Sequence, residues 1–366
     1  MNSIKPIKIA ILSSIHGHAP SYYGLADSPF YDLVAYSVVP GYEDICAKQN
    51  FPTAPRYWSD EELYANHPDL EAVIIGSENS RHYEQTMEAL RRGLHVLTMK
   101  VPTMNLEQYR IMMALAKEKG VIVQVELELR SYSAPYRAAE LIRSGAIGKL
   151  QSINIINYSH NPGWWCPWQV DAELSYGERV PLRPGDDRFR GGALTDHAHP
   201  FDLVRMIAGA DFDTVYANVT PNIREGMEVE DMIRLIGRMK NGVTFSIDPS
   251  YANNEHDVKR LTNIFLWRKY PKIVEVFMTA VGSEGTIISD LYGKNNYLQL
   301  GPDSAYHVSM GDNSGLGSYI TTNFYHNVRQ NRQPEENLEM HYNSIQAMVA
   351  GYESVTRGEP VKISDL

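Results

Sequence analysis

The stretch Gly191 to Leu203, GGALTDHAHPFDL, gathers the residue types most suited to proton chemistry in this sequence. Two glycines precede a predicted helix that carries Asp196, His197 and His199 within one turn. Residues three apart share a helix face, so Asp196 and His199 could contact one substrate hydroxyl together. An imidazole has an ordinary pKa that suits proton exchange near neutrality. The stretch therefore predicts that Asp196 and His199 contact a substrate hydroxyl jointly, with an imidazole suited to exchange its proton.

Other interpretations of the same residues stay open. Asp196 could be a helix N-cap residue, His199 a satisfied core histidine, and Asp202 only an anchor for the helix. A metal site of Asp196, His197 and His199 is a weaker alternative, because two histidines two apart point to different sides of a helix.

Lys100 is the second candidate for chemistry. It follows the apolar run His95 to Met99, and Pro102 comes shortly after it. Ligands of open α/β sheets bind at the carboxyl ends of the strands. An ammonium group placed there can stabilise an alkoxide that develops on a substrate. The alternative is a solvated surface lysine.

A parallel sheet would position these groups. Short apolar runs at 7–12, 32–39, 72–76, 95–99 and 121–125 predict buried strands. Helical patterns at 82–92 and 106–119 lie between them, and both end in basic residues followed by glycine. The alternation predicts an α/β fold, a doubly wound Rossmann domain over residues 1–125.

The turn after the first strand, Ser13-Ser14-Ile15-His16-Gly17, is the expected phosphate loop. A dinucleotide fingerprint has three glycines, and only Gly17 is present. The serine hydroxyls and the N–H groups of the following helix could still bind phosphate. The alternative is a plain β–α turn of a flavodoxin-like fold. No arginine stands close to the end of the second strand, which gives a mild preference for NAD over NADP.

Residues 126–366 show a different pattern. A helix at 136–144 precedes an alternating strand at 150–158, and further strands are predicted at 214–219, 232–239, 244–249, 274–281 and 286–289. A long helix at 336–356 follows. Successive strands with few helices predict an α+β domain with a large, mostly antiparallel open sheet. The loop around Trp164, Trp165 and Trp168 could stack on sugar rings or simply pack.

The composition sets outer bounds on function. A net charge of −10 without a basic cluster argues against a nucleic-acid partner. The two cysteines, Cys46 and Cys166, have no metal-ligand spacing and suggest no disulfide framework. No apolar run approaches the roughly 20 residues of a membrane helix. We expect a cytoplasmic protein without a membrane segment.

Taken in order, these segments resemble the Gfo/Idh/MocA family of glucose–fructose oxidoreductases and inositol dehydrogenases. The resemblance rests on Asn79 to His82, His95 to Lys100, Leu129-Arg130, Leu141 to Leu150, Gly191 to Leu203 and Val281 to Thr286. It implies NAD(P)-dependent chemistry on sugars, cyclitols or glycosides. It also implies a second domain whose open sheet often forms a dimer interface, hence a homodimer or homotetramer.

The matched positions imply roles for single residues. Lys100 would orient the substrate, His199 would be the general acid/base, and Asp196 would support it. The expected cofactor-binding residues are Ser13, Ser14, Ile15, His16, Gly17, Ser77, Asn79, His82, Met99 and Lys100. The expected substrate-binding residues are Arg130, Trp165, His197 and Tyr158.

The sequence departs from the family pattern in three places. The glycine-rich loop is degenerate, and Asp196 precedes His199 by three residues rather than four. The third place is around Lys100, where Met99 stands instead of the usual glutamate and the proline is displaced by one to Pro102. The leading hypothesis is a sugar or glycoside dehydrogenase. One alternative is a glycoside-cleaving enzyme that oxidises its substrate transiently with a retained NAD. Another is a non-catalytic nucleotide or sugar sensor.

Overall fold

The chain forms two compact units. The computed structural model describes residues 4–16, 24–38, 53–159, 162, 166–252, 276–291, 295–300, 305–309 and 316–366. Unit 1 comprises Met1–Leu127, Glu173–Gly177 and Gly315–Tyr342. Unit 2 comprises Glu128–Ala172, Glu178–Ser314 and Asn343–Leu366. The division predicted at residue 125 assigned all later residues to one domain, whereas the segment at 315–342 returns to unit 1.

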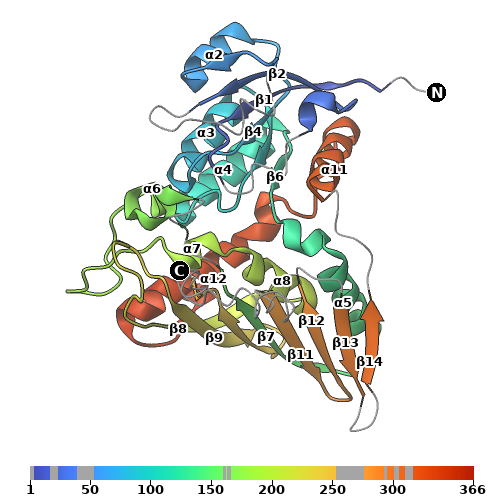
Figure 1. The fold of residues 1–366 in the computed structure, drawn as a ribbon, viewed down its shortest axis with the longest axis vertical. Helices are drawn as coiled ribbons and strands as arrows, with labels where there is room; N and C mark the ends of the chain where they lie inside the picture. Colours follow the sequence, from blue (N-terminus) through green and yellow to red (C-terminus); the bar gives the residue numbers. More distant parts are fainter. Residues whose placement is uncertain are drawn as a thin grey trace, which may run out of the picture. The chain divides into compact units, whose positions relative to one another are not determined.

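Unit 1 contains a six-stranded, wholly parallel sheet in the order β3-β2-β1-β4-β5-β6 (Figure 1). The strands are β1 (Ile7–Leu12), β2 (Tyr31–Ser37), β3 (Arg56–Tyr57), β4 (Ala72–Ile75), β5 (His95–Thr98) and β6 (Val123–Val125). Strand order reverses between β1 and β4, which is the crevice where doubly wound folds bind ligands. The predicted Rossmann sheet is confirmed.

Helices flank this sheet and end where the local sequence dictates. They are α2 (Asp60–Asn66), α3 (Asn79–Arg91) and α4 (Leu106–Lys119), with the short η2 (Leu25–Asp27). Asn105 caps α4 by accepting the N–H groups of Glu107 and Gln108. Gly120 ends the same helix with a φ of 64°, a left-handed conformation that favours glycine.

Helix α11 (Leu316–Gln330) belongs to unit 1 because its apolar face completes the core. Ile320 and Phe324 are buried in the same cluster as Ile7 and Ile9 of β1. Arg329 donates to both carboxylate oxygens of Glu71, which precedes β4. A contact between residues so distant in sequence leaves no local pattern, so periodicity could not reveal it.

Unit 2 contains a nine-stranded sheet in the order β14-β13-β12-β11-β7-β10-β9-β8-β15. The strands are β7 (Leu150–Asn157), β8 (Phe212–Val219), β9 (Ile233–Met239), β10 (Thr244–Asp248), β11 (Val276–Gly282), β12 (Thr286–Asp290), β13 (Asn295–Gln299), β14 (Ala305–Ser309) and β15 (Val361–Lys362). Neighbours are antiparallel except β7 and β10. The predicted, mostly antiparallel sheet is confirmed, and β13, β14 and β15 are additions.

One face of this sheet is covered by helices. They include α5 (Ser133–Arg143), α8 (His199–Ala208) and α12 (Leu338–Arg357), the last of which begins in unit 1. Phe201 of α8 lies 5.9 Å from Phe212, whose ring centroid lies 4.9 Å from that of Phe245. These aromatic contacts pack α8 against the face of the sheet to which the Phe245 side chain of β10 points. The smaller elements are η3 (Glu128–Ser131), η5 (Pro167–Val170), α6 (Ala172–Tyr176), α7 (Ala193–Asp196) and η6 (Ile363–Asp365).

Candidate functional site

The loop after β1 leaves a buried hydroxyl without a partner. Ser13 adopts a φ of 63°, the left-handed region, at the position where a dinucleotide fingerprint has its first glycine. Its side chain is buried, and its Oγ has no hydrogen-bond partner among the described residues. Ser14 and His16 are also buried, and Ile15 is half-buried. Gly17 lies outside the described residues.

Gly76 lets the loops after β1 and β4 touch. A Cβ atom on Gly76 would lie 2.7 Å from the carbonyl oxygen of Ser13. The Gly76 carbonyl accepts the N–H of His16, and the Gly76 N–H donates to Leu12. Sequence reasoning saw this residue only as the end of a strand, although a glycine at that place is the available signal for a close backbone approach.

The start of α3 carries two further buried polar atoms. Asn79 Oδ1 and Glu78 Oε2 have no hydrogen-bond partner among the described residues. Burial raises the pKa of Glu78. Ser77 is engaged, because its hydroxyl donates to Gln85 Oε1 at 2.6 Å. Buried polar atoms without partners are rare in folded proteins, so those of Ser13, Glu78 and Asn79 mark this edge as a place for a polar ligand.

His82 joins the loops that follow β4 and β5. Its ring is fully buried, with Nδ1 2.8 Å from the Val101 carbonyl and Nε2 3.0 Å from the Ser77 carbonyl. Burial lowers the pKa of His82 to about 4, and the charge of Lys100 adds to this effect. The ring therefore connects the loop of Ser77 to the loop of Lys100 and Val101.

Lys100 is buried, with 4% of its surface exposed. The alternative of a solvated surface lysine is therefore wrong. Lysines are rarely buried, and Lys100 is buried at the carboxyl end of β5. The side chain of Met99 is part of the hydrophobic core of unit 1.

A carboxylate that the sequence did not reveal stands at the end of β2. Asp60, the first residue of α2, accepts the hydroxyl of Ser37 at 2.5 Å and the amide of Gln85 at 2.7 Å. Arg81 also reaches it, at 3.1 Å. The sequence showed no arginine near the end of β2 because Arg81 comes from a different element. Dinucleotide-binding folds place an acid near this strand end to hold the ribose hydroxyls.

In unit 2, the segment with Asp196 and His199 is not one helix. Helix α7 ends at Asp196 and α8 begins at His199. Between them, the backbone of His197 is not helical, with φ −102° and ψ 62°. In a continuous helix the Pro200 ring would clash with the carbonyl of Asp196, four residues earlier. The expectation that Asp196 and His199 share one helix face is therefore wrong. Asp196 is also not an N-cap, because Ala198 holds that position for α8.

Asp196 has two close neighbours. The Tyr251 hydroxyl donates to Asp196 Oδ2 at 3.1 Å, and His197 Nε2 lies 3.9 Å from the same oxygen. The orientation of the His197 ring is set by the contact between its Nδ1 and the Ala193 carbonyl, at 2.7 Å. All three side chains are buried. Sequence reasoning missed Tyr251, whose only local signal is its position just after β10.

The remaining predicted residues separate into two groups. His199 is buried at the start of α8, and Asp202 pairs with Arg130 of η3 at 3.0 Å. Asp202 thus anchors α8, and Arg130 is its partner. Tyr158 donates to Asp248 at 3.0 Å, and strand alternation places Asp248 on the sheet face opposite to Phe245 and α8. The structure does not bring Tyr158 together with α8, and Trp165 lies outside the described residues.

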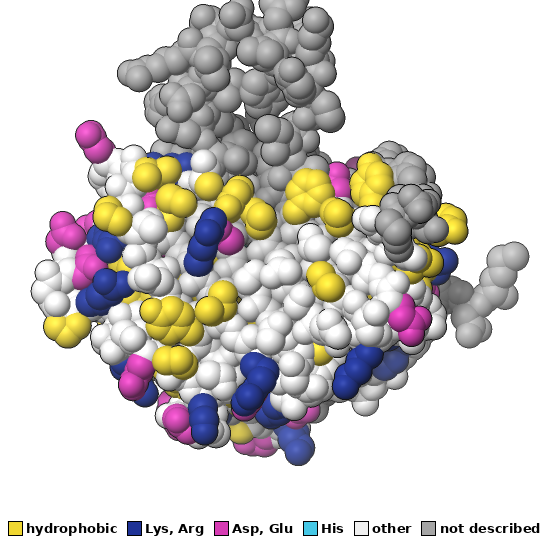
Figure 2. Space-filling view, turned by 90° about the horizontal axis from the view of Figure 1, so that it is seen from below, with side chains coloured by type: hydrophobic (Ala, Val, Ile, Leu, Met, Phe, Trp, Pro, Cys, Tyr) yellow, Lys and Arg dark blue, Asp and Glu magenta, His cyan; other side chains and the backbone are white. Residues whose placement is uncertain are grey.

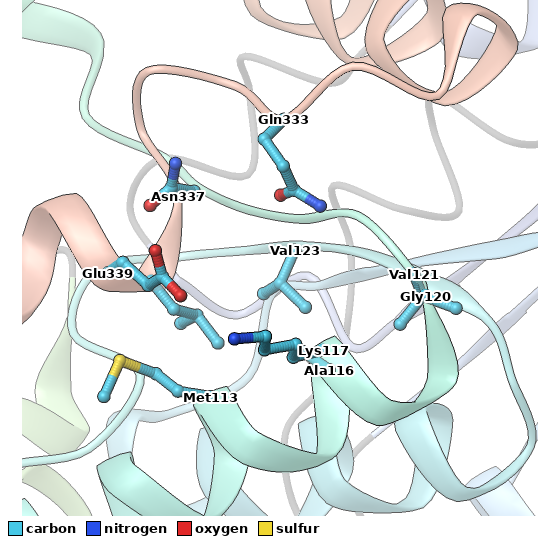
Figure 3. Close-up of a pocket in the computed structure, with 10 residues that line it drawn as sticks. Met113, Ala116, Lys117, Gly120, Val121, Val123, Gln333, Asn337 and Glu339 are labelled. Carbon is cyan, nitrogen blue, oxygen red and sulfur yellow. The ribbon is translucent and has the colours of Figure 1, made fainter.

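A separate pocket in unit 1 contains none of the predicted residues. It has a volume of about 400 Å³ and lies between α4, β6 and the segment before α12 (Figure 3). Lys117 and Glu339 line it, and both are exposed. Within the described ranges, no three His, Cys, Asp or Glu side chains gather as metal ligands. No helix in the described part of the chain is long and apolar enough to cross a membrane.

Comparisons with known proteins agree with both units. Residues 37–127 match the model of the oxidoreductase family with an NAD-binding Rossmann fold, and residues 136–288 match a GFO/IDH/MocA C-terminal domain. A 1,5-anhydro-D-fructose reductase of Ensifer adhaerens is 34% identical over 42% of this chain and 42% of its own length. The scyllo-inositol 2-dehydrogenase (NADP(+)) IolW of Bacillus subtilis is 29% identical over 51% of this chain and 48% of its own. The chain thus spans about half the length of these curated relatives.

Solved structures share the whole fold at low identity. An oxidoreductase from Agrobacterium radiobacter in complex with NAD+, L-tartaric acid and magnesium has a TM-score of 0.79 at 16% identity, covering 99% of both chains. An inositol dehydrogenase homolog from Azotobacter vinelandii complexed with NAD+ has a TM-score of 0.77 at 13% identity, covering 99% of this chain and 98% of the other. With the two domain matches and the strand order described above, the chain belongs to the GFO/IDH/MocA oxidoreductase family.

Proposed function

We propose that this protein is an NAD(P)-dependent oxidoreductase acting on a hydroxyl-bearing carbon of a sugar, cyclitol or glycoside. The observation that carries the proposal is the buried Lys100 at the carboxyl end of β5, in a sheet with the strand order of dinucleotide-binding domains. The substrate class is supported by the relatives, which include a sugar reductase and an inositol dehydrogenase.

The residues of unit 1 fit a dinucleotide. Ser13 and Asn79 have buried polar atoms without partners among the described residues, and Asp60, held by Ser37, Gln85 and Arg81, places a carboxylate beside the end of β2. We assign the cofactor to these residues, with the loop of Ser14, Ile15, His16 and Gly17 beside the phosphates. When bound, the nicotinamide supplies or accepts a hydride. His82 holds the loops in place rather than contacting the ligand, because its buried ring lies between the Val101 and Ser77 carbonyls.

The proton and charge of the substrate hydroxyl are handled by side chains of this chain. In the oxidative direction, His199 takes the hydroxyl proton, and in the reductive direction it returns the proton. The Lys100 ammonium stabilises the negative charge that develops on the oxygen. His197, which lies beside Asp196, is proposed as a substrate contact, while Arg130 pairs with Asp202 and Tyr158 donates to Asp248.

Cofactor binding is the first test. A ligand that binds only the native state adds about 2.7 kcal/mol of stability at a hundred times its Kd. We expect the melting temperature of charcoal-stripped protein to rise with NADH or NADPH, and the comparison of the two identifies the preferred cofactor. A melting temperature that neither nucleotide changes at saturating concentration would exclude the proposed function.

A matched pair of histidine variants tests the catalytic assignment. With a panel of sugars, cyclitols and glycosides, we expect His199→Ala to lose roughly a hundredfold or more in kcat, the usual contribution of a general acid/base. Binding of NADH should stay unchanged. His197→Ala should mainly raise KM. The reverse result would move the acid/base role to His197, the imidazole that the structure places near Asp196.

A matched pair of lysine variants tests the oxyanion role. Lys100→Met should lower kcat by roughly a hundredfold, as removal of an oxyanion donor does. Lys117→Met, on an exposed face of α4, should leave kcat unchanged. Equal activity of both variants would contradict the assignment. Release of aglycone from a glycoside without net NADH formation would instead identify the cleavage reaction that the family resemblance also permits.

We propose that the uncovered face of the nine-stranded sheet joins two copies of the chain. Strand pairing places Tyr216 and Ile236, then the polar Ser246, Asn154 and Thr279, then Ile288 and Tyr297 in one row across this face. Of these, Ile236 is 54% exposed and Tyr297 47% exposed. Figure 2, the view from below, shows apolar side chains in several groups among polar ones.

Light scattering on a sizing column gives the mass in solution. We expect a dimer or tetramer for the native chain and a monomer for Ile236→Glu, because a charge on this face would be buried unpaired. The matched control Ile111→Glu, at an exposed position of α4, should keep the native mass. A monomeric native protein would refute the interface.

A further inference from the structure

Glu230 is a fully buried carboxyl group that the proposed chemistry does not use. It precedes β9 and has no exposed surface. Its Oε2 accepts the N–H of Gly192 at 3.1 Å, and its Oε1 accepts the N–H of Leu194 at 3.1 Å. Its backbone carbonyl accepts the N–H of Ala193 at 2.9 Å. Three successive N–H groups thus donate to one residue.

These N–H groups open helix α7, which ends at Asp196. The first N–H groups of a helix have no partner inside the helix, so Glu230 takes the place of a cap from a distant part of the chain. The approach is close, because a Cβ on Gly192 would lie 1.8 Å from the Glu230 carbonyl oxygen. Only glycine fits at position 192 while these bonds are kept.

Tyr352 of α12 joins the same cluster. Its hydroxyl donates to Glu230 Oε1 at 2.8 Å and accepts the N–H of Gly191 at 2.9 Å. The hydroxyl of Thr195 lies 3.0 Å from it. Burial raises the pKa of Tyr352 well above its ordinary value, so the hydroxyl keeps its proton and remains a donor.

The C-terminal end of α7 is held by the residue next to Glu230. Asp196 accepts the hydroxyl of Tyr251, and the Tyr251 N–H donates to the carbonyl of Asp231 at 2.8 Å. Glu230 and Asp231 are neighbours in the chain. Glu230 therefore fixes the beginning of α7 directly, and its neighbour Asp231 fixes the carboxylate of Asp196 through Tyr251.

We propose that Glu230 is a positioning residue, whose ionised carboxylate sets the placement of Asp196 and His197 by holding the first N–H groups of α7. The ionised form is the one that accepts all these bonds, since a protonated oxygen would face a donor. Burial raises the pKa of Glu230 to about 7 against the opposing effect of its donors. The inference rests on the proposed function only in its kinetic test.

The variant Glu230→Gln tests the proposal at nearly constant shape. Its amide would turn its NH2 toward the N–H of Gly192, since the other oxygen already accepts from Leu194 and Tyr352. Well above pH 7, we expect kcat to fall by up to about a hundredfold, as a misplacement of about 1 Å produces. The Kd for NADH should not change.

Two further variants distinguish a loss of positioning from a loss of folding. Tyr352→Phe removes one donor and keeps the carboxylate, so it should lower kcat less than Glu230→Gln. The control is Glu353→Gln, at the residue that follows Tyr352 in α12. It breaks the ion pair of Glu353 with Arg190 and should leave kcat unchanged. A Glu230→Gln protein that melts like the control and keeps native kcat would overturn the proposal.

Histidine NMR separates this inference from the proposed reaction. The His197 signals, assigned with His197→Asn, report on α7 because His197 Nδ1 contacts the Ala193 carbonyl. We expect Glu230→Gln to shift these signals and to leave those of His82 in unit 1 unchanged. If the native protein oxidises no substrate, a shift of His197 still supports the positioning role. Unchanged His197 signals would refute it whatever the activity.

Discussion

Replacement of Gly192 by alanine should be among the most damaging single methyl additions in unit 2. The added Cβ would lie 1.8 Å from the backbone oxygen of Glu230 and 2.9 Å from its carboxyl carbon. Real Cβ atoms keep roughly 3 Å or more from such atoms, so the two backbone segments must move apart by about 1 Å. The nearer neighbour is backbone, and the carboxyl group is held by the N–H groups of Gly192 and Leu194, so the strain cannot be relieved by a side-chain rotation.

The structure gives the expected magnitude. Separation weakens the bonds from Gly192 and Leu194 to the carboxylate and the bond from Ala193 to the carbonyl. Bonds to a charged group contribute about 1.5–3 kcal/mol each and a neutral one about 1 kcal/mol. Partial loss of these bonds predicts a decrease of about 3–5 kcal/mol in the free energy of unfolding, at the upper end for single substitutions.

Thermal melting of unit 2, followed by hydrogen exchange of peptides from its strands, measures the change. At about 2–4 °C per kcal/mol, the melting temperature should fall by roughly 6–20 °C. Gly351→Ala is the matched control, because its Cβ would meet the flexible Cδ2 of Leu235 at 2.7 Å within a helix that favours alanine. A Gly192→Ala protein as stable as this control would refute the argument that the two segments are in rigid contact.

Three further results are expected. Burial lowers the pKa of His82 to about 4, so between pH 4 and pH 6.5 the unfolded chain binds more protons than the native chain. The free energy of unfolding of the wild type should therefore rise with pH across this window by about 3 kcal/mol. In His82→Asn the corresponding rise in melting temperature should be flattened. Tyr251→Phe removes the donor to Asp196 and should lower kcat by about tenfold with an unchanged Kd for NADH, whereas an unchanged kcat would show that the bond is dispensable. Arg329→Met leaves the half-buried Glu71 unpaired and should destabilise unit 1 by about 1–2 kcal/mol in urea unfolding, while equal midpoints would mean that the pair contributes little.

The fold could be predicted in large part from the sequence, because its signals are local. Buried strands such as Ile7–Leu12 are short apolar runs, and helices such as Leu106–Lys119 end at glycine. These patterns depend on residues within a few positions of one another. The alternation of strands and helices then implies a parallel sheet, because parallel strands need a crossover between them.

The site was only partly visible for the opposite reason. Lys100 and His199 could be proposed as site residues because their own segments carry a pattern, but the break between α7 and α8 was missed although Pro200 signals it. Asp60 stands beside Ser37 through a contact that crosses 23 positions of the chain. No local pattern reports such a contact.

The sequence alone thus determined the two types of sheet and the resemblance to a family, and it singled out the loops proposed to carry the chemistry. The tertiary structure decided that Lys100 is buried, that 315–342 completes unit 1, and that Glu230, Tyr251 and Tyr352 surround α7. The physical reason is that burial and hydrogen-bond partners depend on which distant segments meet. Periodicity describes one segment, whereas the environment of a buried polar group is set by all the segments packed around it.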